Sequence, residues 1–133
     1  MSIFHKKPRI RAPQLKLVSL HIPKTAGTSF RNILKEVYGD DHVVRFDINQ
    51  RIFINNEAFN GRKIDDVINV IHGHFQYSEL IKTVRLPEGV PVITWLRHPV
   101  ERVISNYFYL EKILREERYP DFAALWRIFH ASR

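Results

Sequence analysis

Apolar segments rich in β-branched residues recur along the chain, and segments with helical spacing separate them. Near-continuous apolar runs of this kind are typical of strands that are buried on both faces of a parallel sheet. Because strands alternate with helices, the pattern favours an α/β fold in which helices cover a parallel sheet. We expect strands at 15–22, 42–47, 66–71 and 92–97, helices at 28–38, 77–84, 99–118 and 121–130, and an irregular connection with one short element at 48–63.

Length and charge narrow the classes of protein and partner. A chain of 133 residues, 44% of them apolar, is enough for one core. We expect a basic flexible arm at 1–14 and one domain at 15–133. The arm has no apolar run of the kind found in signal peptides, and no segment is long enough for a membrane span, so we expect a cytoplasmic protein.

The formal net charge of +7 suits a polyanionic partner such as a nucleotide, a sulfated sugar, nucleic acid or an acidic membrane. Nucleic acid is the weakest of these, because the basic residues are spread along the chain without a recognised reading motif. The absence of cysteine excludes a disulfide framework and a thiolate metal site.

A first anion-binding motif, Pro23–Ser29, lies between an expected strand and an expected helix. Backbone N–H groups at a helix N-terminus have no intrahelical partner and can bind a phosphate. Gly27 allows close approach, while Lys24 adds a charge and Thr28 a hydroxyl. The alternative is an ordinary capped turn. A P-loop kinase is disfavoured, because the motif has Thr where a Walker A loop has its Lys. His21, which precedes the motif, receives no role.

A second motif runs from Leu96 to Tyr107, again at the junction of an expected strand and helix. Arg97 should lie at the carboxyl edge of the sheet, where ligands of α/β proteins bind, and Ser105 should lie on the following helix. The alternative is a structural role in which Arg102 pairs with Glu101 or another surface acid. We expect the aromatic residues 107–109 to fill the core. Two separate anion motifs suggest a ligand that carries phosphate at two points.

His72-Gly-His74 follows an expected strand, and a spacing of two places both imidazoles on the same side of an extended chain. An imidazole titrates near neutral pH and can serve as a general base. Two alternatives stay open. One is a metal site with Glu79 as a third ligand, and the other is a structural pair satisfied by backbone hydrogen bonds.

Both motifs resemble those of the Golgi-type carbohydrate sulfotransferases, whose members include heparan sulfate 2-O-sulfotransferase. The resemblance covers residues 15–125. It implies that the 3′-phosphate of 3′-phosphoadenosine 5′-phosphosulfate (PAPS) is bound by Arg97 and Ser105. It also implies that His74 is the base with His72 in support, and that Lys24 stabilises the leaving phosphate. The implied ligands of the 5′-phosphosulfate are Lys24, Thr25, Ala26, Gly27, Thr28 and Ser29.

The implied function is transfer of a sulfuryl group from PAPS to an acceptor hydroxyl, on a carbohydrate in these relatives, with no metal. Family domains continue well past the second motif, whereas this sequence stops at Arg133. The alternative is therefore a noncatalytic module that binds PAPS or 3′-phosphoadenosine 5′-phosphate (PAP), or a truncated inactive relative. The apolar segment Phe122–Phe129 suggests a homodimer through the last helix.

Overall fold

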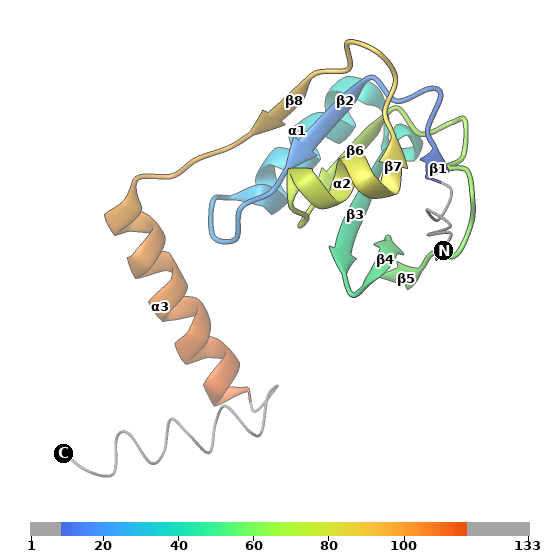
Figure 1. Cartoon of the computed structure of the whole chain (residues 1–133). Coiled ribbons are helices and arrows are strands. Elements are labelled where there is room, and N and C mark those ends of the chain that lie inside the picture. The colour runs from blue at the N-terminus through green and yellow to red at the C-terminus, as the bar shows by residue number, and fades with distance from the viewer. Residues whose placement is uncertain (1–8, 117–133) are drawn as a thin grey trace, which may run out of the picture. The chain divides into compact units, whose positions relative to one another are not determined.

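A computed structural model describes residues 9–116. The chain divides into two units, residues 1–96 and residues 97–133, and each is described by itself. The first unit contains a six-stranded sheet, and residues 97–116 of the second contain one long helix (Figure 1).

The sheet of the first unit has the strand order β5-β4-β3-β6-β2-β8. Its central strands, β3, β6, β2 and β8, pair in parallel, whereas β4 and β5 pair antiparallel at one edge. The predicted α/β fold with a parallel core is therefore confirmed, with an antiparallel extension. The strands are β2 (Leu17–Leu20), β3 (Val43–Asn49), β4 (Arg51–Ile54), β5 (Glu57–Ala58), β6 (Val70–Gly73) and β8 (Val92–Thr94).

Two helices cover opposite faces of this sheet. Leu34 of α1 (Gly27–Tyr38) packs in a cluster with Val43 and Val70, whereas Leu80 of α2 (Tyr77–Thr83) belongs to a cluster with Ile71. Because successive side chains of a strand point to opposite faces, neighbouring residues of β6 contribute to different clusters. Both faces of β2 and β6 are thus buried, as their near-continuous apolar sequences predict, whereas Val92 and Thr94 of the edge strand β8 are exposed.

The connection at 48–63 differs from the prediction of irregular structure. It contains a hairpin of β4 and β5 joined by Asn55 and Asn56, whose φ angles are 51° and 70°. A two-residue turn with positive φ at both positions matches the right-handed twist of the strands, and asparagine tolerates this conformation. The Asn55 side chain also accepts a hydrogen bond from the backbone N–H of Arg45, at 3.0 Å.

The strand predicted at 66–71 begins four residues later than expected. Asp65 forms a turn in which its carboxylate accepts the N–H of Val67 at 3.1 Å and its carbonyl accepts the N–H of Ile68 at 3.1 Å. This local bonding competes with the strand ladder, which is a common property of aspartate.

The flexible arm predicted at 1–14 is wrong for residues 10–12. Ile10 and Arg11 form β1, which pairs in parallel with β7 (Val84–Arg85). Ile10 and Ala12 are buried in the same cluster as Leu80. Burial of these apolar side chains stabilises the attachment of residues 10–12 to the domain. The basic residues of this segment, taken alone, do not predict it.

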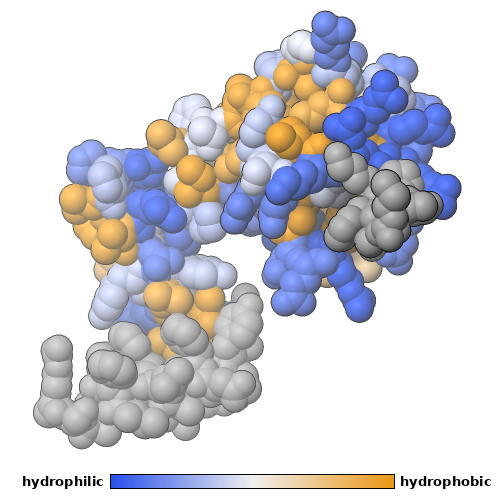
Figure 2. Space-filling model, in the orientation of Figure 1, coloured by the Kyte–Doolittle hydropathy of each residue, from blue (hydrophilic) through white to orange (hydrophobic). Residues whose placement is uncertain are grey.

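The second unit holds α3 (Pro99–Arg115), whose first residue is a proline preceded by the extended His98. The predicted helix start is therefore confirmed. The aromatic residues 107–109, expected in the core, are exposed, and Figure 2 shows apolar side chains of α3 among hydrophilic ones. The helix predicted at 121–130, with its proposed dimer contact, lies outside the described residues. Among residues 9–116, no helix has the length and apolarity to span a membrane.

Candidate functional site

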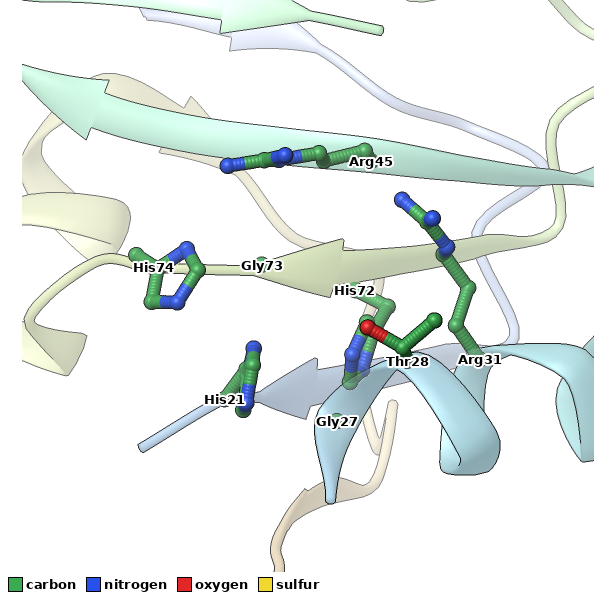
Figure 3. Close-up of a pocket in the computed structure, with 8 residues that line it drawn as sticks. All are labelled: His21, Gly27, Thr28, Arg31, Arg45, His72, Gly73 and His74. Atoms are coloured by element: carbon green, nitrogen blue, oxygen red, sulfur yellow. The ribbon is translucent and has the colours of Figure 1, made fainter. Parts of the chain in front are cut away.

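A pocket opens where β2 and β6 end side by side. Leu20 pairs with Gly73, and the N–H of His21 donates to the Gly73 carbonyl at 2.7 Å, so the next residues leave the sheet together. Carboxyl ends of neighbouring parallel strands form the ligand crevice of α/β proteins. The pocket has a volume of about 70 Å³ and is lined by His21, Gly27, Thr28, Arg31, Arg45, His72, Gly73 and His74 (Figure 3).

One wall of the pocket is the start of α1. Lys24 and Ala26 adopt left-handed φ angles of 68° and 61°, which turn the chain sharply into the helix. Thr25 is buried, and its hydroxyl donates to the carbonyl of Ile22 at 2.7 Å, so its proton is used within the loop. No side chain caps the helix N-terminus. The N–H groups of its first turn therefore lack intrahelical partners and favour an anion.

Gly27 brings this helix start directly onto His21. A Cβ at residue 27 would overlap the His21 imidazole, so only glycine permits this approach. Thr28 and Ser29 are exposed, and Thr28 lies on the pocket wall. The loop and the histidines therefore belong to one site.

Three imidazoles gather along the ends of the two strands. The centroid of His21 lies 4.4 Å from that of His74 and 5.2 Å from that of His72. As their spacing predicts, His72 and His74 line the same pocket (Figure 3). Burial, followed by the nearby charge of His74, lowers the pKa of His21.

His72 is the buried member of this group. Its Nδ1 lies 2.8 Å from the hydroxyl oxygen of Ser19 on the adjacent strand. Burial lowers its pKa to about 4, the charges of His21 and Arg31 act in the same direction, and a backbone hydrogen bond with Gly27 opposes them. His72 is therefore neutral at pH 7, which suits a support role better than proton transfer from the acceptor.

His74 is more exposed and is bound on one side by Asp47. Its Nδ1 lies 2.9 Å from Asp47 Oδ1, and its backbone N–H donates to the same oxygen at 2.8 Å. Arg45 Nε donates to Asp47 Oδ2 at 2.6 Å. Burial raises the pKa of Asp47, but the hydrogen bonds from His74 and Arg45 outweigh it and lower the pKa overall.

Four residues of this site have no role predicted from the sequence: His21, Arg31, Arg45 and Asp47. Arg31 follows Thr28 by three residues, so one helical turn could have indicated a shared face. Arg45 and Asp47 could not be found in this way, because the pairing of β3 with β6 brings Arg45 to the pocket and Asp47 to His74. Arg31 and Arg45 both line the pocket, and because Arg45 is paired with Asp47, it is Arg31 that adds positive charge suited to an anionic ligand.

The residues of the second motif lie in the second unit. Arg97 Nε donates to Glu101 Oε2 at 3.2 Å. Ser105 is half-buried on α3. For the metal alternative, residues 9–116 contain no group of three side chains placed to hold a metal ion, and Glu79 lies exposed on α2.

Comparison with known proteins adds one finding. A family model described as "Sulfotransferase family" matches residues 8–132, nearly the whole sequence. No curated protein and no solved structure matches the chain.

Proposed function

Because the chain belongs to the sulfotransferase family, we propose that it transfers a sulfuryl group from PAPS to the hydroxyl of a carbohydrate acceptor. The observation that carries this proposal is the convergence of the α1 start with His74 in one pocket. An anion-binding helix start and an imidazole are the two groups that sulfuryl transfer to an alcohol requires, one for the donor and one for the acceptor proton.

In this reaction His74 Nε2 takes the proton of the acceptor hydroxyl as its oxygen attacks sulfur. The new oxygen–sulfur bond forms while the bond between sulfur and the 5′-phosphate oxygen breaks. Both electrons of that bond stay on the phosphate, whose growing charge Lys24 and the N–H groups of α1 stabilise. As in phosphoryl transfer, positioning and electrostatics supply most of the rate enhancement.

The pocket volume is consistent with part of the donor. By the usual measure one water needs about 10–15 Å³, so roughly 70 Å³ holds several waters, comparable to a tetrahedral sulfuryl group rather than a whole nucleotide. We assign the 5′-phosphosulfate to residues 24–29. Arg97 and Ser105 are assigned to the 3′-phosphate from their motif, where a guanidinium and a hydroxyl supply charge-assisted bonds.

A transfer assay with ³⁵S-labelled PAPS and a panel of polysaccharides, sugars and simple alcohols tests the proposal. We expect labelled product with at least one carbohydrate. His74→Ala should lower the rate by about 10²- to 10⁴-fold, the usual contribution of a general base, while PAP binding measured by calorimetry stays unchanged. Lys24→Ala should weaken both transfer and PAP binding.

His42→Ala is the matched control, because it removes an imidazole whose Nδ1 contacts the Val67 carbonyl at 2.6 Å and which is not among the pocket residues. Its transfer rate should stay close to that of the unmodified protein. PAP binding without transfer to any acceptor would instead indicate a noncatalytic nucleotide-binding module. If neither binding nor transfer occurs, the proposed function is wrong.

A further inference from the structure

The carboxylate of Asp47 takes a place in the sheet that a backbone carbonyl normally fills. The parallel pairing of β3 with β6 runs as far as Arg45 and His72, and the N–H of Ile48 donates to the His74 carbonyl at 3.0 Å. Between these contacts, the N–H of His74 donates to Asp47 Oδ1 at 2.8 Å. The side chain of residue 47 therefore completes the hydrogen bonding of β6 where this strand ends.

Close approach of the two strands makes this possible. A Cβ at residue 73 would overlap the Phe46 carbonyl oxygen and would also approach Asp47 Oδ1 at 2.9 Å. Gly73 thus leaves room for β3 beside the end of β6. As a result, the Asp47 carboxylate lies directly beside the base.

The same oxygen also binds the His74 ring, with 2.9 Å between Asp47 Oδ1 and His74 Nδ1. A carboxylate oxygen can only accept, so Nδ1 must carry the proton. In a neutral imidazole with a protonated Nδ1, the lone pair lies on Nε2. The ring is therefore presented with its basic nitrogen away from Asp47.

The second carboxylate oxygen is held by Arg45, whose Nε donates to Oδ2 at 2.6 Å. The exposed fraction of the Asp47 side chain is only 14%, so solvent screens these contacts less than a surface pair. With Oδ2 bound to Arg45, Oδ1 remains directed at both hydrogen-bond donors of His74. Arg45 thus fixes the orientation of the carboxylate.

We propose that Asp47 is the positioning residue of His74: it fixes the ring in the tautomer with a free Nε2 and stabilises the imidazolium that forms when this nitrogen takes a proton. The part of the inference that concerns catalysis rests on the proposed function. The part that concerns the tautomer rests only on the contacts of Asp47. A carboxylate that orients a histidine through Nδ1 is a recurring arrangement in enzymes of unrelated fold.

Nuclear magnetic resonance of the protein labelled with ¹⁵N-histidine tests the tautomer without any substrate. The His74 signals are assigned from their loss in His74→Gln. We expect the Nδ1–H tautomer in the unmodified protein, and a mixture or the Nε2–H tautomer in Asp47→Asn, whose amide can donate to Nδ1. Asp40→Asn is the matched control, because Asp40 pairs with Lys35 at the surface and its replacement should leave the His74 signals unchanged.

The pH–rate profile of sulfuryl transfer tests the catalytic part. The charged or titratable groups that contact His74 or line its pocket are His21, His72, Arg31, Arg45 and Asp47. Removing the negative charge in Asp47→Asn disfavours the imidazolium, so the acid limb should move to lower pH while kcat falls on the order of 10²-fold with little change in KM. Arg45→Gln removes a positive charge and should move the same limb to higher pH.

These outcomes separate the inference from the proposed function. An unchanged His74 tautomer in Asp47→Asn, in a protein whose circular dichroism shows it folded, overturns the inference even if transfer is detected. If Asp47→Asn does not fold, the pH–rate profile of Arg45→Gln is the deciding measurement. An acid limb that does not move in this variant excludes coupling of the Arg45–Asp47 pair to His74 and overturns the inference. A changed tautomer without transfer by the unmodified protein supports the inference and rejects sulfuryl transfer.

Discussion

His72 shows how one buried side chain makes stability depend on pH. Its pKa is lowered from 6.5 to about 4 in the folded protein by burial. Between these two pH values the unfolded chain binds a proton that the folded protein does not. The stability that comes from keeping His72 neutral is therefore fully present above about pH 6.5 and is lost as the pH falls toward 4. We expect the free energy of unfolding to decrease over this window by at most roughly 3 kcal/mol.

Urea unfolding at pH 7.5, 6, 5 and 4.5 measures this decrease. His21, whose pKa is also lowered, contributes in the same direction, whereas Asp47 acts below the window because its carboxyl pKa lies under 3.8. In His72→Asn, whose amide can hydrogen-bond with the Ser19 hydroxyl but does not titrate, the pH dependence should be shallower. An equally steep dependence in this variant would show that another group is responsible.

At the residue scale, the sequence could predict which side chains belong to the site but not which side chains they contact. The pattern His-Gly-His predicts two imidazoles on one side, and both line the pocket. Their different environments could not be predicted, because the burial of His72 depends on Ser19 and on the helix above it. Asp47 lies 27 residues before His74. No local spacing indicates that contact, since it depends on the register of two strands.

The hairpin of β4 and β5 is an element that its turn sequence could have predicted. Asn55-Asn56 has the residue type that a two-residue turn with positive φ favours, although Asn-Gly is the stronger signal. Asn56→Gly should therefore raise the free energy of unfolding by a few tenths of a kcal/mol to about 1 kcal/mol. Asn56→Val should lower it by about 1–2 kcal/mol, because a β-branched residue is strained at positive φ.

Thermal unfolding of both variants measures these changes. Each variant is the control for the other, because residue 56 is exposed and both substitutions remove the same amide. Equal stabilities would mean that the turn conformation is wrong. The pocket-lining residues lie outside β4 and β5, so nucleotide binding should be unaffected in either variant.

At the element scale, buried strands and long helices were the most predictable parts. Apolar runs predict β2, β3, β6 and β8. For β2 and β6 the reason is that strands buried on both faces cannot tolerate many polar residues, whereas β8 is an exposed edge strand. Short elements were missed, as β1 shows: two residues form a strand only because β7 lies beside them and Ile10 is buried. Such a strand depends on distant pairing and leaves little periodicity in the sequence.

The assignment of two phosphates to two motifs is a prediction about the whole chain. If Arg97 binds the 3′-phosphate, Arg97→Ala should weaken binding of PAP by about 10- to 100-fold, the loss of one charge-assisted contact, and should leave binding of adenosine 5′-phosphate nearly unchanged. Calorimetric titration of both nucleotides at one salt concentration measures the difference.

Arg115→Ala is the control for loss of a guanidinium from the same helix, because Arg115 pairs with Glu111 at the opposite end of α3. It should bind both nucleotides as the unmodified protein does. Equal weakening of PAP and adenosine 5′-phosphate by Arg97→Ala would contradict a specific role at the 3′-phosphate. Such a result would instead favour a general electrostatic effect of the net charge of +7.

At the scale of the molecule, the sequence predicts the α/β class, because alternation of strands and helices needs no knowledge of contacts. It also predicts that both motifs follow strands. The first follows β2, whereas β8 ends at Thr94, three residues before Arg97, so the predicted strand end at Arg97 is wrong. The order of strands could not be predicted from this alternation, because β6 lies between β3 and β2 although both precede it in the sequence. That insertion brings Asp47, His21 and His74 to one edge of the sheet.

The hydrogen bond from the His74 backbone to Asp47 restricts which sequences can maintain this fold. An apolar strand residue at position 47 would leave the N–H of His74 without its acceptor, which costs roughly 1–3 kcal/mol when buried. Substitutions during divergence are then limited to short side chains that accept a hydrogen bond, whether or not the chain retains activity. A homologue with aspartate at this position therefore preserves a strand end and an oriented imidazole together, and one with asparagine or serine preserves the strand end alone.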